Sequence, residues 1–195
     1  MKVLPRSFYA RDSLVVAPEL LNKLLVTTTD DGVRVAARIV EVEAYRGSDD
    51  PGSHAYRGMT PRTEVMFGPP GHLYVYFTYG MHWCANVVAT KDGDAAAVLL
   101  RAAAPVDGID VMRERRVKAR RDRDLLAGPA RLCQAFGITG EQNGADLVRG
   151  AVRILDDGVA PPDRPGVSTR IGLAPGRGDD HLWRFVVPGE PNLSR

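Results

Sequence analysis

The stretch Val33 to Tyr45, with the sequence VRVAARIVEVEAY, decides the fold. It is rich in valine and alternates apolar and polar residues near its end, which is typical of a β-strand. Further strands are predicted at Leu73 to Tyr79 (LYVYFTY), Cys84 to Ala89 (CANVVA) and Ala95 to Arg101 (AAAVLLR). Because the Asp92-Gly93 pair between the last two strands is a turn signal, we expect a hairpin there.

Helices are predicted on either side of these strands. An N-terminal helix is expected to begin at Asp12-Ser13 and to keep helical spacing as far as Leu25. The basic stretch 111–124 is also predicted to be helical, and a third helix is expected from Gly128-Pro129-Ala130, with proline at its first position. Short strands are expected near the C-terminus, at Val152 to Leu155, Thr169 to Leu173 and Trp183 to Val187. This mixture predicts an α+β fold with mainly antiparallel or mixed strands.

The length and composition are those of an ordinary globular domain. The chain has 195 residues, of which 44% are hydrophobic and 26% charged. Nothing suggests a domain boundary, so residues 1–195 are expected to form one domain. Cys84 and Cys133 lie far apart in apolar contexts, and we expect two reduced core residues rather than a disulfide. The first residues lack an apolar stretch long enough for a signal peptide or a membrane span, so a cytoplasmic protein without a membrane partner is expected.

Positive charge is concentrated in one segment. Residues 111–124, VMRERRVKARRDRD, carry seven basic and three acidic side chains, a local charge of +4 in a chain whose net charge is only +2. Such a stripe is typical of a surface that contacts a phosphate backbone. It is equally typical of a solvated helix with ion pairs such as Glu114 with Lys118, and the stripe alone favours this second interpretation.

Residues suited to chemistry gather in the first half of the chain. Glu41 and Glu43 are two apart on a strand, so both carboxylates are expected on one face, either as a polar strand end or with one as a general base. Residues 74–83, YVYFTYGMHW, are strongly aromatic, and Tyr79 precedes a glycine at an expected turn. The long connection 46–72 carries His54 and is a candidate functional loop.

The inventory excludes several reaction classes. The histidines and cysteines have no zinc spacing, no serine lies in a nucleophile elbow, and no phosphate-loop fingerprint is present. We therefore expect no metal and no cofactor. A carboxylate base with several aromatic rings suits hydrolysis of a substrate held by stacking, but this pattern names no substrate.

These residues, taken in order, resemble the alkyladenine (3-methyladenine) DNA glycosylase family, in a short form without an N-terminal extension. The resemblance covers nearly the whole chain. It rests on the segments RIVEVEAY (38–45), SHAYRG (53–58), MFGPPGHLYVYFTYGM (66–81), CAN (84–86), VLLRA (98–102), GPARLCQA (128–135) and TRIG (169–172). It implies one compact α+β domain around a curved, mainly antiparallel sheet with flanking helices.

The resemblance also implies an activity: a monofunctional glycosylase that flips damaged purines out of the duplex and hydrolyses their N-glycosidic bond. Glu43 would be the general base that activates the attacking water. Tyr45, His54 and Tyr76 would line the base pocket, and Asn86 would exclude the amino group of guanine. No lysine falls in these motifs, which argues against a Schiff-base lyase.

The implied partner is double-stranded DNA, bound by a monomer. Tyr79 would enter the minor groove and fill the gap left by the flipped nucleotide, and Arg101 would hold the adjacent phosphate. Further phosphate contacts are expected from the basic stripe, through Arg113, Arg115, Arg116, Lys118, Arg120 and Arg121. Two alternatives stay open: a non-catalytic nucleic-acid-binding domain of the same fold, and a hydrolase of free nucleosides. The sequence does not rank 3-methyladenine, 7-methylguanine, hypoxanthine and ethenoadenine as substrates.

Overall fold

The computed structural model describes residues 1–29 and 32–194. Within them, nine strands form one open, antiparallel sheet with a main path β1-β7-β2-β3-β6-β5-β4. Strand β9 pairs with both β3 and β8. The strands are β1 (Lys2–Val3), β2 (Leu24–Thr28), β3 (Arg34–Arg46), β4 (Leu73–Thr78), β5 (His82–Ala89), β6 (Ala96–Asp107), β7 (Val152–Asp156), β8 (Gly166–Ser168) and β9 (Arg184–Val186).

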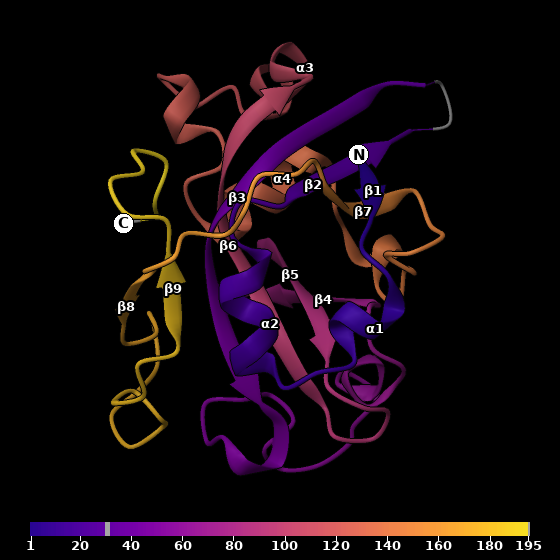
Figure 1. Ribbon diagram of the computed structural model, residues 1–195, viewed down its shortest axis with the longest axis vertical. Helices are drawn as coiled ribbons and strands as arrows, with labels where there is room; N and C mark the ends of the chain where they lie inside the picture. The colour runs from indigo at the N-terminus through magenta and orange to yellow at the C-terminus, as the bar shows by residue number, and fades with distance from the viewer. Residues whose placement is uncertain (30–31, 195) are drawn as a thin grey trace.

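Strand β3 is the organising element of the sheet. It pairs with β6 along one edge, while its other edge is divided between β2, which pairs with residues 34–38, and β9, which pairs with residues 41–43. The β3–β6 register shifts on both sides of Glu41, and such irregularities bend a strand and increase its twist. Figure 1 shows β3 curving from the top of the molecule to its base. Residues 41–43 of this curved strand pair with β9.

Four helices flank the sheet in the described part of the chain: α1 (Arg6–Tyr9), α2 (Ser13–Leu20), α3 (Ile109–Arg115) and α4 (Pro129–Phe136). Helix α2 packs on β3, and α4 packs on β5 and β6. Their apolar faces join one large core with the strands, to which Leu20, Leu100 and Leu132 contribute fully buried side chains. The expected α+β domain with a curved antiparallel sheet and flanking helices is therefore confirmed. No helix among the described residues is long and apolar enough to cross a bilayer.

The structure confirms the predictions made for the central strands, the hairpin that joins two of them, and the cysteines. The four central strands form where expected, although β6 continues past Arg101 to Asp107. The hairpin at Asp92-Gly93 joins β5 to β6, whose ends pair at Ala89 and Ala96. Cys84 and Cys133 are free, buried thiols. The connection 46–72 contains two short 3₁₀ turns, at Gly47–Asp49 and Glu64–Phe67.

The N-terminal helix is shorter than the prediction. It ends at Leu20, and Leu24 and Leu25, expected within it, lie in β2. Asn22 has φ +66°, a left-handed conformation that stops a helix. The short apolar run Leu24-Leu25-Val26 fits a helix and a buried strand equally well, so pairing with β3 and β7 decides the outcome.

Two other predicted elements, the helix at 111–124 and the strand at 169–173, also differ from the structure. The stretch 111–124 is α-helical only to Arg115, and Arg116 leaves the helix with φ −119° and ψ 47°. A short 3₁₀ turn follows at Asp122–Asp124. Because cations crowd this segment, a continued helix would place like charges three or four residues apart, which destabilises it. The expected strand Thr169 to Leu173 is irregular, and β8 lies just before it, at Gly166–Ser168.

Candidate active site

A cleft of about 330 Å³ opens on one face of the β4–β5–β6 part of the sheet. It brings together five side chains expected at the site, namely Tyr45, His54, Tyr76, Asn86 and Arg101, with Tyr79 at its margin. The remaining wall comes from residues that the sequence did not single out as site residues, which are Gly52, Ser53, Met66, Tyr74, Thr78, Cys84, Leu99, Pro129, Ile171, Gly172 and Leu173. Segments from all parts of the chain therefore converge here.

The sheet register explains why these residues meet. Glu43 on β3 pairs with Leu99 on β6, Leu99 pairs with Asn86 on β5, and Asn86 pairs with Tyr74 on β4. Residues that pair across adjacent strands project from the same face of a sheet. The row therefore runs from a carboxylate at one end to an aromatic ring at the other, with Arg101 and Tyr76 on the same face two residues along their strands.

Three rings form the aromatic wall. Tyr74 and Tyr76 are stacked with their centroids 5.5 Å apart, and His54 meets Tyr76 edge to face at 4.5 Å. Nδ1 of His54 lies 3.1 Å from the Tyr74 hydroxyl. Burial, and then the charge of Arg62, lower the pKa of His54, so this imidazole is neutral at physiological pH. An uncharged wall of rings suits a flat heterocycle, including a cationic one.

Asn86 lies on the floor of the cleft. It is buried, and its Nδ2 donates a hydrogen bond to the Tyr74 carbonyl at 3.2 Å. Beside it, burial and the neighbouring Cys84 raise the pKa of Tyr76, which keeps its hydroxyl protonated. The floor of the cleft therefore presents two uncharged polar groups to a ligand, the Asn86 amide and the Tyr76 hydroxyl.

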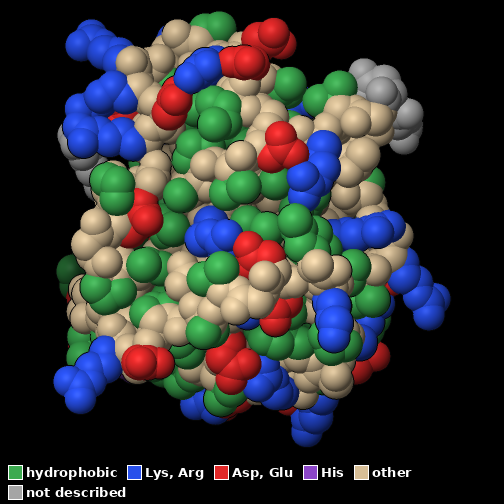
Figure 2. Space-filling view, turned by 45° about the horizontal axis from the view of Figure 1, so that its top comes forward, with side chains coloured by type: hydrophobic (Ala, Val, Ile, Leu, Met, Phe, Trp, Pro, Cys, Tyr) green, Lys and Arg blue, Asp and Glu red, His purple; other side chains and the backbone are tan. Residues whose placement is uncertain are grey.

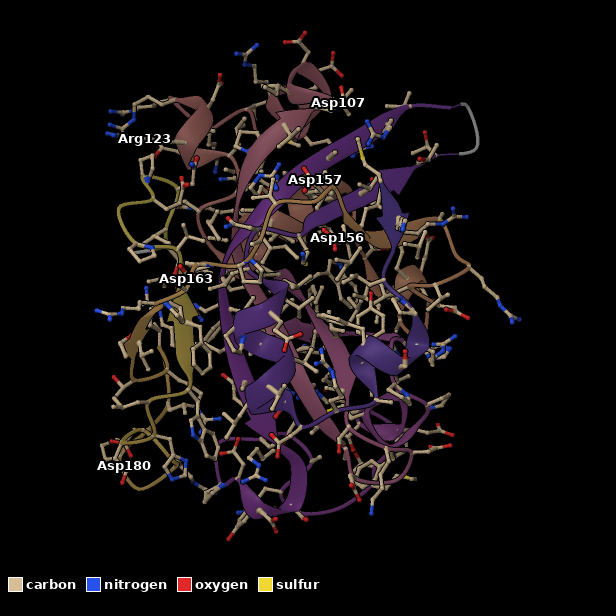
Figure 3. The ribbon with its side chains drawn as sticks, viewed as in Figure 1. Asp107, Arg123, Asp156, Asp157, Asp163 and Asp180 are labelled. Carbon is tan, nitrogen blue, oxygen red and sulfur yellow. The ribbon has the colours of Figure 1, made fainter. Side chains whose placement is uncertain are left out.

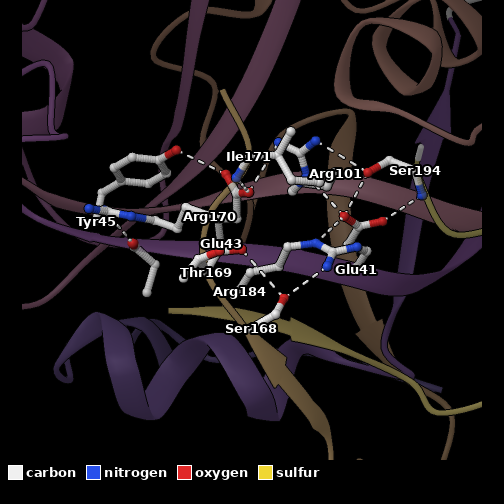
Figure 4. A network of polar contacts seen from close by, with 11 residues as sticks. Glu41, Glu43, Tyr45, Arg101, Ser168, Thr169, Arg170, Ile171, Arg184 and Ser194 are labelled. Carbon is white, nitrogen blue, oxygen red and sulfur yellow. Dashed lines mark hydrogen bonds and ion pairs between the residues drawn. The ribbon is translucent and has the colours of Figure 1, made fainter. Parts of the chain in front are cut away.

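Glu43 is fully buried behind this lining rather than in it. Its Oε1 accepts hydrogen bonds from the Ile171 backbone N–H at 2.7 Å and lies 3.2 Å from Nη1 of Arg101. Its Oε2 accepts one from the Tyr45 hydroxyl at 2.9 Å. Figure 4 shows these contacts, and all three partners line the cleft. Burial, and then the charge of Glu43, raise the pKa of Tyr45 well above its usual value, which preserves this tyrosine as a donor.

Arg101 is shared between the two glutamates, which face the same side of β3 as expected. Its Nε donates to Oε1 of Glu41 at 3.0 Å, and its Nη2 to Oγ of Ser194 at 3.2 Å. Glu41 also accepts from Nε of Arg184 at 2.7 Å and from the Ser194 backbone N–H at 2.6 Å. Arg101 is thus held rigidly, at the edge of the cleft and against Glu43 (Figure 4).

A buried ion pair supports the opposite wall. Nη2 of Arg170 donates to Oδ1 of Asp50 at 2.7 Å, and both side chains are inaccessible to solvent. The Arg170 guanidinium lies 4.5 Å from the ring centre of Tyr45 and 5.0 Å from that of Trp183. The pair therefore ties the segment that carries Ile171 to the connection that carries His54. Sequence reasoning missed it, although the TRIG segment contains Arg170.

Tyr79 projects from the tip of the β4–β5 hairpin, beside the cleft. Thr78 pairs with His82, so Tyr79, Gly80 and Met81 form the loop. Tyr79 is 84% exposed and has φ +50°. Met81 is also exposed at 68%. An apolar tip of this kind has no partner within the described chain, which is unusual unless it meets another molecule.

The basic stripe divides into paired and unpaired cations. Arg113 bonds to Asp110 and Asp122, and Arg121 bonds to Asp124. Two others bond to uncharged groups: Arg115 to the Ala135 carbonyl, and Arg116 to the Leu125 carbonyl and the Gln134 side chain. The exposed side chains of Lys118 and Arg120 make no ion pair among the described residues. The expected ion pair between Glu114 and Lys118 does not form there either, because the helix ends at Arg115.

Comparison with known proteins assigns the family. A family profile described as Methylpurine-DNA glycosylase (MPG) matches residues 7–191. A protein of Burkholderia cenocepacia (strain HI2424), named a 3-methyladenine DNA glycosylase, is 53% identical over 194 residues, covering 98% of this chain and 91% of that protein. A protein of the same name from Carboxydothermus hydrogenoformans (strain ATCC BAA-161 / DSM 6008 / Z-2901) is 49% identical over 195 residues, covering 99% of each chain. The chain therefore belongs to the methylpurine-DNA glycosylase family and, as a member of it, is a DNA glycosylase.

Proposed function

We propose that this enzyme flips alkylated or deaminated purines out of duplex DNA and hydrolyses their N-glycosidic bond with a water activated by Glu43. One observation carries the proposal: a buried carboxylate lies directly behind an aromatic cleft, and three residues that contact it line that cleft. Substrates are expected among 3-methyladenine, hypoxanthine and ethenoadenine. The protein would act as a monomer on DNA in the cytoplasm, without a cofactor.

The cleft suits a flipped purine energetically. Extruding a base costs a few kcal/mol, and less for a damaged base. Stacking on aromatic side chains returns about 1–3 kcal/mol per base, so the rings of Tyr76, His54 and Tyr45 can offset this cost. Alkylated purines carry positive charge, which the faces of tyrosine rings attract. Asn86, fixed to the Tyr74 carbonyl, would clash with the 2-amino group of a normal guanine.

The chemical step exchanges one bond at C1′ and moves one proton. The water oxygen bonds to C1′ of the sugar as the bond from C1′ to the purine nitrogen breaks, and that electron pair leaves with the base. One water proton passes to Glu43, and the other remains on the new C1′ hydroxyl. A cationic alkylated base leaves uncharged, whereas an uncharged base leaves as an anion that takes a proton from solvent. Oε2 of Glu43 accepts one hydrogen bond within the described chain, from Tyr45, and a carboxylate oxygen can accept two. The same negative charge would stabilise the oxocarbenium-like sugar.

Glu43→Gln tests this assignment, because it keeps the shape of the side chain and removes its charge. Single-turnover excision of hypoxanthine or ethenoadenine from a duplex is expected to fall by at least about 10²-fold, the lower end of general-base catalysis. Lesion-duplex affinity should stay within a few-fold of the wild-type value. Glu19→Gln is the matched control, since Glu19 is a half-exposed carboxylate on α2 paired with Arg11. Excision by Glu43→Gln at the wild-type rate would refute the mechanism.

The same assay separates the alternatives. A nucleoside hydrolase would cleave free inosine as fast as the same lesion in a duplex, and it would have no use for the exposed Tyr79 tip. A non-catalytic binding domain would bind the lesion duplex without releasing base. We expect release of base from duplex and not from nucleoside.

A further inference from the structure

Arg170 is a fully buried cation close to the proposed base, although it makes no ion pair with Glu43 in the described part of the chain. Figure 2 shows Lys and Arg side chains projecting into solvent around one face of the molecule, whereas the side chain of Arg170 is inaccessible to solvent. Burying a charge is costly unless hydrogen bonds and a counter-ion compensate it, so the partners of Arg170 decide where it can lie.

Four hydrogen bonds fix the guanidinium group of Arg170. Nη1 and Nη2 donate to the two carboxylate oxygens of Asp50, at 2.5 and 2.7 Å. Nη1 also donates to the Ala44 carbonyl at 3.0 Å, and Nη2 to the Gly178 carbonyl at 3.1 Å. A Cβ atom at Gly178 would lie 2.6 Å from Nη2, so the loop that carries this glycine leaves the guanidinium little room to move. This planar, bidentate arrangement holds the side chain in one orientation.

Two of the groups that contact Glu43 are held in place by Arg170. The guanidinium lies 4.5 Å from the ring centre of Tyr45, whose hydroxyl donates to Oε2 of Glu43 at 2.9 Å. Ile171 directly follows Arg170 in the chain, and its backbone N–H donates to Oε1 of Glu43 at 2.7 Å. The Ala44 carbonyl, which Nη1 binds, belongs to the residue between Glu43 and Tyr45. Figure 4 shows that Arg170 lies beside both donors.

The third contact of Glu43 is supported separately. It comes from Arg101, whose guanidinium is anchored by Glu41 and Ser194. Loss of the contacts of Arg170 would therefore release the two hydrogen-bond donors and leave the neighbouring charge in place. Because a donor to each carboxylate oxygen fixes the direction of the remaining lone pairs, these two donors decide how Glu43 meets a water molecule.

We propose that Arg170 is a positioning residue for hydrolysis: it fixes the Tyr45 hydroxyl and the Ile171 N–H, which orient the carboxylate of Glu43 toward the attacking water. This inference rests on the proposed function. Orientation acts on the rate of the chemical step, and a misplacement of about 1 Å can cost about 10²-fold. Arg170 does not itself line the aromatic cleft, so binding of the flipped base should depend on it much less.

Arg170→Lys tests the proposal, because lysine keeps the positive charge and loses the planar, bidentate pair with Asp50. Single-turnover excision of hypoxanthine from a duplex is expected to fall by about 10- to 10²-fold. Flipping of ethenoadenine, measured by the fluorescence of the base, and affinity for the lesion duplex should stay within a few-fold of the wild-type values. A loss of flipping as large as the loss of excision would overturn the proposal, since Arg170 would then only support the cleft.

Arg38→Lys is the matched control. Arg38 also lies on a carboxylate in bidentate fashion, donating to both oxygens of Asp157, and it also donates to a backbone carbonyl, that of Asn22. Figure 3 labels Asp157 in the upper half of the molecule and Asp180, two residues after Gly178, near its base. Excision by Arg38→Lys is expected at the wild-type rate.

Two further variants keep the test decisive if Arg170→Lys does not fold, which denaturant unfolding would show. The guanidinium of Arg170 lies 5.0 Å from the ring centre of the half-buried Trp183. Trp183→Leu removes this ring and keeps the hydrogen bonds of Arg170, so it should slow excision less than Arg170→Lys and leave flipping unchanged. In a Tyr45→Phe background, where the hydroxyl is absent, each substitution should lower excision by a smaller factor than in the wild type. Equal factors in the two backgrounds would overturn the route through Tyr45.

The same rates distinguish this inference from the proposed function. Excision at the wild-type rate by both Arg170→Lys and Trp183→Leu, with Glu43→Gln still slow, would overturn only the role of Arg170. Failure of the wild-type chain to release any base from a lesion duplex would overturn the proposed function, and the positioning role with it.

Discussion

Two glutamates that look equivalent in the sequence differ in their surroundings. Glu41 is held by two arginines and by both the backbone and side chain of Ser194. Burial alone would raise the pKa of Glu41, but the hydrogen bonds from Ser194 and Arg184, with the charge of Arg101, hold it below the usual value. Glu43 shares only Arg101 with it. The hydrogen-bond partners of each glutamate therefore distinguish a structural carboxylate from a candidate base. The two-residue spacing in the sequence does not reveal these partners.

Glu41→Gln is therefore expected to act mainly on stability. Removing the charge leaves Arg184 without its anion and Arg101 with Glu43 alone, and breaking a buried pair typically costs about 3–5 kcal/mol. Denaturant unfolding measures the loss. Excision should fall as well, because Arg101 loses its anchor beside Glu43, but by less than in Glu43→Gln. Full stability in Glu41→Gln, or an excision defect as large as that of Glu43→Gln, would contradict this division.

The sign of the pH dependence follows from the lowered pKa of Glu41. A carboxyl group with a lower pKa in the folded state contributes stability that is complete above its unfolded value of 4.5. This contribution disappears as the pH falls through the folded value. The wild-type protein should therefore lose stability on acidification below about pH 4.5 more steeply than Glu41→Gln does.

At the residue scale, the sequence predicted more of the site than of its support. Alternation in β3 correctly placed both glutamates on one face, and five of the expected side chains share one cleft. The supporting contacts were out of reach because they join distant positions. Arg170 and Asp50 are 120 residues apart, and nothing local in either segment specifies the partner.

At the scale of elements, strands with clear alternation or β-branched runs were predictable, and their lateral register was not. Hydrophobic pattern fixes which face of a strand is buried. It does not fix the shift between β3 and β6 near Glu41, which brings Leu99 opposite Glu43. The failure at β2 has the same origin, since the pairing of Leu24 with Arg38 and Leu155 is a property of the sheet. Local sequence therefore predicted most elements and few of their neighbours.

The β4–β5 hairpin gives a prediction at this scale. Tyr79 is held at its tip in a left-handed backbone conformation, and its exposed ring contributes little packing. Tyr79→Ala should leave the unfolding midpoint nearly unchanged. We expect it to weaken flipping of ethenoadenine in a duplex by about 5- to 160-fold, equivalent to the roughly 1–3 kcal/mol of one aromatic stack. The fluorescence of the lesion base measures flipping directly.

Val159→Ala is the control for the hairpin. Val159 is a partly exposed apolar residue in the loop after β7, and it does not line the aromatic cleft. Wild-type flipping by Tyr79→Ala would remove the ring from the mechanism, and a large loss of stability would show that its role is structural.

At the scale of the molecule, the aromatic cleft lined by Tyr45, His54 and Tyr76 exists only in the complete fold. Its walls come from four central strands, the 46–72 connection, the start of α4 and the 171–173 segment. Ser194, near the C-terminus, bonds to both Glu41 and Arg101. Folding therefore brings the candidate base and the aromatic wall together. No window of the sequence contains more than a part of this arrangement.

The residues that line the aromatic cleft predict hydrolysis by water rather than attack by an amine. A glycosylase that also cleaves the strand attacks C1′ with an amine and passes through a Schiff base. The chain has four lysines, Lys2, Lys23, Lys91 and Lys118, and none of them lines the aromatic cleft. Borohydride should therefore trap no covalent adduct between the protein and a lesion duplex, as judged by denaturing electrophoresis. Excision should also survive EDTA, because the attacking water is assigned to a carboxylate. A trapped adduct that disappears in Lys118→Gln would show that the amine of Lys118 attacks C1′, and it would refute the water mechanism.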